Sequence, residues 1–127
     1  MKKYILFLAV IGLISCHNPR RLGKKKDPKV EQTETTNMRL IVSFISIGSG
    51  TDGEARKQLD AYLGEYQTKN KVSLDVKMTK WGREGEIDYC FKLSELKDKE
   101  QSSFIKEVQD LLKNSTLVRY TENSPCK

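Results

Sequence analysis

The sequence predicts a small α+β domain with the element order βαββαβ, the ferredoxin-like arrangement of a four-stranded antiparallel sheet with two helices on one face. The chain has 127 residues, which is room for one domain. Apolar side chains follow a strand pattern in four segments and recur at helical spacing in two others. These segments follow one another as strand, helix, strand, strand, helix, strand, which is the order that this fold requires.

The first strand is predicted at residues 39–48, where the sequence RLIVSFISIG is apolar on both alternating sets of positions, as in a central strand. A Gly-Ser-Gly run at 48–50 ends it. Thr51 and Glu54 then stand at the spacing of a helix capping box. Helical spacing of apolar side chains predicts the first helix after them, with Ala55, Leu59, Tyr62, Leu63 and Tyr66 on its buried face.

A hairpin is predicted next. Alternating apolar side chains indicate one strand at 72–79 (Val72, Leu74, Val76 and Met78) and another at 87–93 (Ile87, Tyr89, Phe91 and Leu93). The segment 81–85 supplies the turn. Glu84, Glu86 and Asp88 alternate with basic residues, and we interpret them as solvated cross-strand partners.

The last two elements are a helix and a short strand. Asp98 with Gln101 indicates a second helix cap, and an apolar face follows it (Phe104, Ile105, Val108, Leu111 and Leu112). Residues 117–121 are the predicted fourth strand, and residues 122–127 are a predicted tail. On the third strand Tyr89 and Phe91 should face the helices, so Cys90 should face the open side of the sheet.

The N-terminal segment has the layout of a secretory signal. Two lysines precede an apolar run at 4–13, which is much shorter than the roughly 18–20 residues of a membrane-spanning helix. The following Leu13-Ile14-Ser15-Cys16 resembles the lipobox of bacterial lipoproteins. That resemblance implies cleavage before Cys16, acylation of this cysteine and anchoring in the bilayer of the bacterial cell envelope, facing the periplasm or the exterior. An ordinary signal peptide with a cysteine near its cleavage point is the alternative.

Charge divides the chain into a basic linker and a nearly neutral domain. Eight of the 23 Lys and Arg residues precede residue 30, whereas 15 basic and 14 acidic residues follow from Met38 onward. We therefore expect a signal peptide at 1–15, a basic disordered tether at 16–37 and the folded domain at 38–127. Because the basic excess lies outside the domain, we do not expect a nucleic-acid partner.

Cys90 and Cys126 are the two cysteines left if Cys16 is acylated. An even number of thiols in an exported chain favours a disulfide, and a tail leaving the fourth strand can reach Cys90 across the open face. A redox or metal thiol site is the alternative. The chain has no CxxC motif, and its one histidine, His17, lies in the tether, so we expect neither a metal site nor a cofactor.

Two surfaces are candidates for function. The open sheet face around Ile41, Ser43, Ile45 and Cys90 is a candidate for binding an envelope protein or a second copy of the chain. The predicted topology also brings the 48–51 loop beside the 80–85 hairpin, where Ser49, Thr51, Trp81 and Arg83 would suit a small anionic or aromatic ligand. The leading hypothesis is a lipid-anchored, non-enzymatic binding or assembly domain, and the alternative is a small-ligand carrier or enzyme that uses the loop cluster.

Overall fold

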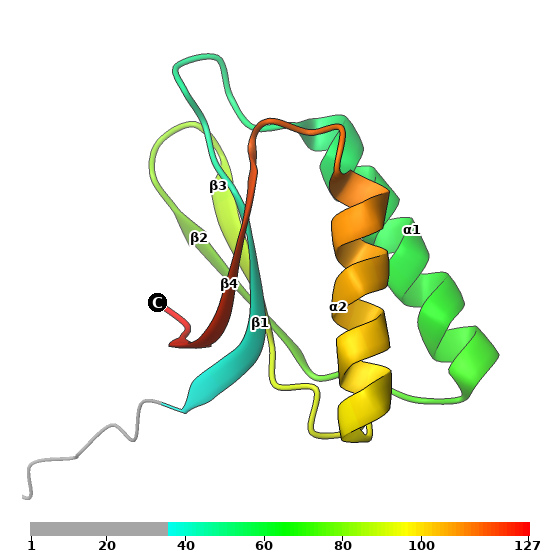
Figure 1. Ribbon diagram of the computed structural model, residues 1–127. Coiled ribbons are helices and arrows are strands. Elements are labelled where there is room, and N and C mark those ends of the chain that lie inside the picture. The colour runs from blue at the N-terminus through cyan, green and yellow to red at the C-terminus, as the bar shows by residue number, and fades with distance from the viewer. Residues whose placement is uncertain (1–35) are drawn as a thin grey trace, which may run out of the picture. The chain divides into compact units, whose positions relative to one another are not determined.

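The six predicted elements are present in the predicted order in the computed structural model, which describes residues 36–127. They are β1 (Asn37–Phe44), α1 (Gly53–Asn70), β2 (Val76–Trp81), β3 (Glu86–Phe91), α2 (Asp98–Leu112) and β4 (Val118–Pro125). The strands form one antiparallel sheet in the order β2-β3-β1-β4. Both helices lie on one side of it (Figure 1), so the ferredoxin-like prediction is confirmed.

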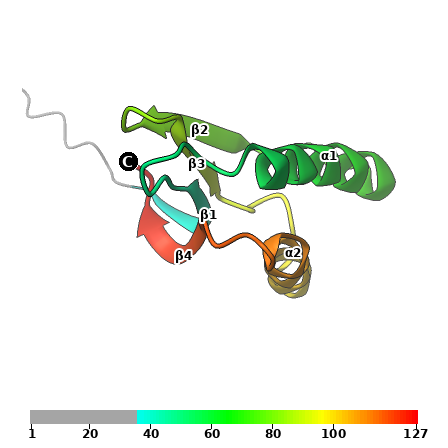
Figure 2. The ribbon, with the colours of Figure 1, turned by 90° about the horizontal axis from the view of Figure 1, so that it is seen from above.

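The main core lies between this sheet and the helices. Its largest members from the strands are Phe44, Tyr89 and Phe91, and the helices contribute Leu59 and Phe104, all fully buried. The Phe91 and Phe104 rings lie edge to face at 5.6 Å between centroids, which joins β3 to α2. Seen from above, the helices stand on the side of the sheet opposite the C-terminal end of the chain (Figure 2).

Three predicted strand ends differ from the observed ones by four residues each. The strand predicted from residue 72 begins at Val76, because α1 continues to Asn70 and Lys71 then ends it in the left-handed conformation (φ 52°). The first strand ends at Phe44, four residues early, and leaves Ile47 79% exposed. The fourth strand continues to Pro125, through most of the predicted tail.

The extension of β4 contains an irregularity. Asn123 has φ 53°, and the ladder between β1 and β4 pairs Leu40 with Glu122 and Met38 with Ser124 but gives Arg39 no partner residue. Met38 is buried with Ile41 and Cys90, although alternation from Ile41 would put it on the opposite face. Arg39 forms an ion pair with Glu122. The regular alternation of the two strands is therefore broken at Arg39 and Asn123. This break lies three residues before Cys126, which is bonded to Cys90 on the open face.

The central strand β3 is buried on both faces. All six of its residues are inaccessible or nearly so, including Glu86 and Asp88. The interpretation of these two carboxylates as solvated partners is therefore wrong. Antiparallel sheets commonly leave one face exposed to water. Here residues 124–127, which we call the C-terminal segment, lie with Trp81 over the face of β3 that points away from the helices.

Residues 1–35 lie outside the described part of the chain. They include the predicted signal peptide (1–15), the lipobox cysteine Cys16 and all but the last two residues of the predicted tether (16–37). Within residues 36–127, neither helix combines the length and the apolar character needed to cross a bilayer.

Candidate functional site

A disulfide lies on the open face of the sheet, the face opposite the helices. Cys90 in the middle of the sheet is bonded to Cys126, 36 residues later in the chain, with 6.0 Å between their Cα atoms. The predicted bridge is thus confirmed. The disulfide packs with Met38 and Ile41 in a small apolar cluster, and Thr79 Oγ1 lies 3.7 Å from Cys126 Sγ. Because of this bond, the segment after β4 is held against the sheet.

A groove of about 330 Å³ lies beside the disulfide on this face. Its floor comes from β1 and β3, its walls from the end of β2 and from the C-terminal segment. The lining residues are Ile41, Ser43, Trp81, Asp88, Thr121, Ser124, Pro125 and Lys127. We call this hollow the open-face groove.

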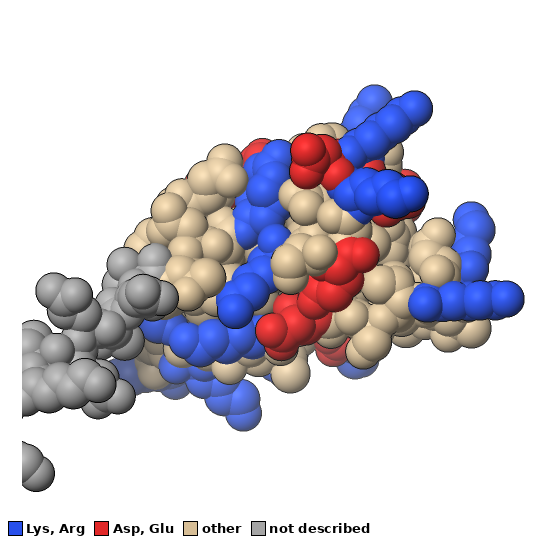
Figure 3. Space-filling model, turned by 90° about the horizontal axis from the view of Figure 1, so that it is seen from below, with Lys and Arg blue, Asp and Glu red and all other residues tan. Residues whose placement is uncertain are grey.

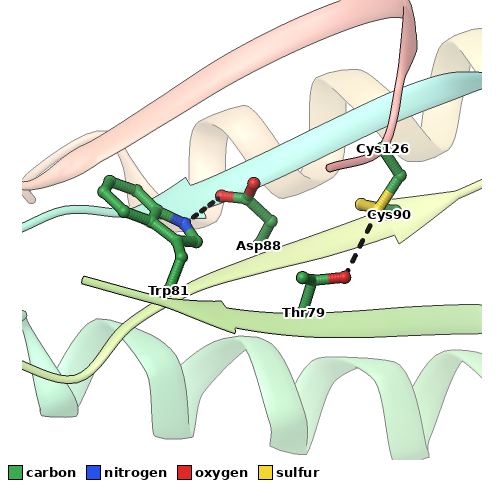
Figure 4. The surroundings of a disulfide bond; sticks show 5 residues. All are labelled: Thr79, Trp81, Asp88, Cys90 and Cys126. Carbon is green, nitrogen blue, oxygen red and sulfur yellow. Dashed lines mark hydrogen bonds between the residues drawn. A yellow bond between two sulfur atoms is a disulfide. The ribbon is translucent and has the colours of Figure 1, made fainter. Parts of the chain in front are cut away.

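Asp88 lies at the bottom of the open-face groove. Asp88 is only 4% exposed, and its Oδ1 accepts a 2.9 Å hydrogen bond from Trp81 Nε1. The two side chains point toward each other from β3 and β2 (Figure 4). The side chains of Ser43 and Thr79, which lie opposite Asp88 in the two ladders, form no hydrogen bond to its carboxylate in the described part of the chain.

Trp81 forms the wall above this carboxylate. The indole is 36% exposed, and the Lys127 ammonium lies 5.3 Å from the ring centroid, which is a cation–π distance. The turn after Trp81 is tight: a Cβ on Gly82, whose φ is +69°, would meet the Glu86 carboxylate at 2.2 Å. Glu86 in turn accepts a hydrogen bond from the Glu84 N–H. The turn that follows Trp81 is therefore tightly packed.

The predicted loop cluster is only partly assembled. The loop after β1 does lie beside the β2–β3 turn, since a Cβ on Gly85 would be 3.9 Å from Thr51 Oγ1. Ser49 and Arg83 are exposed, and neither forms a side-chain hydrogen bond or ion pair within residues 36–127. Trp81 belongs to the open-face groove.

Two backbone N–H groups of that loop, those of Gly48 and Gly50, already have a partner within the chain. Ser46 Oγ accepts from the Gly48 and Gly50 N–H groups at 3.1 Å and donates to the Glu84 carboxylate. Asp52 caps α1 by accepting from the Ala55 N–H at 2.9 Å. A serine hydroxyl and a carboxylate of the chain thus stand where an anionic ligand was expected.

The predicted face residues Ile41, Ser43 and Cys90 do lie together on the open face. Ile45, which was predicted on the same face, lies just beyond the end of β1. Its N–H donates to the Leu117 carbonyl.

A second hollow, of about 380 Å³, is lined by residues 62–70 of α1 and residues 99–107 of α2. Its aromatic residues are Tyr62 and Tyr66, and Tyr62 Oη already donates to Glu107 at 2.8 Å. Burial raises the pKa of both phenols, and for Tyr62 the hydrogen bond to Glu107 adds to the effect. Lys69 and Lys99 stand among three glutamates there, so this groove is not selective for one sign of charge.

The face of the molecule seen from below carries charges of both signs. At the lower end of the molecule a short acidic run has lysine and arginine side chains on both sides (Figure 3), in agreement with the near-neutral balance of residues 38–127. No three His, Cys, Asp or Glu side chains within the described range gather closely enough to hold a metal ion. No protein-family model, curated protein or solved structure matches the chain.

Sequence reasoning identified Cys90, Cys126 and the open face, but it missed Asp88. The available signal was its position two residues before Cys90 on a central strand, which places both side chains on one face. A disulfide that pulls the C-terminal segment over Cys90 must also bring it close to Asp88.

Proposed function

We propose that this protein is a lipid-anchored bacterial envelope protein whose folded domain is a non-enzymatic binding domain. In this proposal the acylated Cys16 holds the chain at the bilayer, and the open-face groove contacts another envelope protein. The observation that carries the binding role is the Trp81–Asp88 pair at the bottom of a groove on the open face.

The disulfide supports export of the chain. Structural disulfides persist in oxidising compartments and are rare in the reducing cytosol of most bacteria. The Cys90–Cys126 bond therefore agrees with the signal-peptide layout of residues 1–16, which was recognised from a separate part of the chain.

The groove supports binding because it combines features that a merely structural surface does not need. A buried carboxylate costs free energy unless charge or hydrogen bonds compensate it, and Asp88 has a single neutral donor within residues 36–127. An aromatic ring beside it is a common anchor in protein interfaces.

Membrane fractionation of the Cys16→Ser variant tests the anchor. The wild-type chain should stay with membranes through high-salt washing and enter the detergent phase on phase separation. Cys16→Ser should appear in the aqueous phase, because it lacks the thiol that carries the acyl chains. The Cys90→Ser, Cys126→Ser double variant is the matched control and should remain anchored. Equal partitioning of Cys16→Ser and the wild-type chain would refute the proposal.

A further inference from the structure

The open-face groove contains an anionic group with an unused acceptor. Asp88 Oδ1 takes the indole N–H of Trp81, while Oδ2 has no hydrogen-bond partner among the described residues. The one fully enclosed polar side-chain atom without a partner in residues 36–127 is Tyr120 Oη. Asp88 Oδ2 is therefore not sealed off, and it faces the groove that this residue lines.

No cation of the described chain forms an ion pair with Asp88. The two ion pairs in residues 36–127 join Arg39 to Glu122 and Lys57 to Glu54. Arg119, opposite Ser43 on the same face, instead donates to the Thr116 and Val118 carbonyls. Lys77 lies on the other side of the disulfide, in a separate hollow with Asp75 and Lys92. A carboxylate in this setting favours an incoming cation.

The Trp81 ring completes a site for an organic cation. Ammonium and guanidinium groups are attracted to an indole face, and a neighbouring carboxylate adds charge-assisted hydrogen bonds. A divalent metal ion would require several oxygen or nitrogen ligands, and no such cluster lies within the described residues. The groove volume of about 330 Å³ is at the small end for ligand sites, which suits one side chain rather than a cofactor.

The position of Lys127 indicates which chemical group fits the open-face groove. Its ammonium already lies over the Trp81 ring, carried by the peptide segment that the disulfide holds against the sheet. It forms no ion pair with Asp88, since no nitrogen of Lys127 comes within 4.0 Å of a carboxylate oxygen in the described chain. A lysine side chain on a polypeptide thus occupies one half of the site and leaves the carboxylate half open.

We infer that the open-face groove binds a lysine side chain of a partner protein, with Asp88 as its counter-ion, Trp81 as its aromatic wall and Lys127 as an internal competitor. This inference specifies the chemistry of the partner in the proposed function and rests on it. The internal lysine occupies a position over the indole ring until a partner lysine that also reaches Asp88 displaces it.

Trp81 is the single tryptophan of the chain, so its fluorescence reports on the groove directly. The test is a titration of the full-length protein, purified in detergent, with lysine blocked at both ends as acetyl-lysine methylamide. Blocked norleucine, which lacks the charge, and blocked glutamate are the ligand controls. We expect a saturable change with the lysine compound alone, with a Kd on the order of 1 mM for one isolated side chain.

Asp88→Asn and Lys127→Ala are the deciding variants. Asn keeps an acceptor for the indole N–H but removes the charge, so the affinity should fall at least tenfold. Lys127→Ala removes the competitor, so the affinity should rise severalfold. Equal binding of norleucine, unchanged affinity in a folded Asp88→Asn, or no saturable response in both wild type and Lys127→Ala would each overturn the inference. Failure here would leave the result of the Cys16→Ser fractionation unaffected, so the two proposals fail separately.

Discussion

At the scale of single residues, buried polar atoms divide into those with partners and those without. Tyr89 Oη donates to Asp60 at 2.8 Å and accepts from Arg56 Nε at 3.0 Å, which ties β3 to α1. Tyr120 Oη is equally enclosed but has no partner within the described residues. Burial raises the pKa of both phenols, so both stay protonated and neutral at neutral pH. Removing the two hydroxyls should therefore have different effects on the free energy of unfolding.

Tyr120→Phe should leave the free energy of unfolding unchanged or raise it by about 1 kcal/mol, because an unsatisfied buried hydroxyl no longer has to leave water on folding. Tyr89→Phe is the matched control and should lower the free energy by about 1–2 kcal/mol through loss of two hydrogen bonds. Urea unfolding of both variants measures this. A Tyr120→Phe protein destabilised as much as Tyr89→Phe would show that Tyr120 Oη has a partner.

At the scale of elements, the start of α1 depends on one carboxylate. Asp52 accepts from the Ala55 N–H with Oδ1 and from the Ser115 hydroxyl with Oδ2 at 2.6 Å, so it joins the helix to the loop before β4. The Ala55 N–H, followed by Ser115, lowers the pKa of Asp52 below its usual 3.8. The negative charge also lies favourably at the helix N-terminus.

The contribution of this cap should depend on pH. A carboxylate whose pKa is lower in the folded state stabilises fully above its unfolded pKa, and that stabilisation is lost as the pH falls through the folded pKa. At pH 7 Asp52→Ala should cost about 1 kcal/mol. Asp52→Asn keeps a capping oxygen but does not titrate. The difference in unfolding free energy between wild type and Asp52→Asn should therefore shrink from pH 6 to pH 2, and a constant difference would contradict this role.

The order and type of all six elements followed from periodicity, because each buries one apolar face against the same core. Their ends were less predictable, since they depend on partners distant in sequence. Thr51 and Glu54 suggested a capping box, but Asp52 is the cap, fixed partly by Ser115. Asp98 was expected to cap α2, but Lys97 precedes the helix and its N–H donates to Glu100. Pairing with β1 extends β4 to Pro125, which no local pattern in residues 122–125 indicated.

At the scale of the whole molecule, the disulfide links the centre of the sheet to the C-terminal segment. Closing a loop of this length stabilises a fold by about 4 kcal/mol in the chain-entropy model, a large share for a domain of fewer than 100 residues. The same bond holds Lys127 and the groove wall in place. In the function that we propose, acylated Cys16 places this face at a membrane and the disulfide shapes the groove, so both bonds can be tested together.

The most direct test is the intact mass of the protein purified from its native membrane, measured after thiol alkylation with and without prior reduction. We expect the mass of residues 16–127 plus acyl and glyceryl groups, with Cys90 and Cys126 alkylated only after reduction. An unacylated mass with both thiols alkylated before reduction would contradict the account, because the chain would then carry neither the anchor nor the bond that builds the groove.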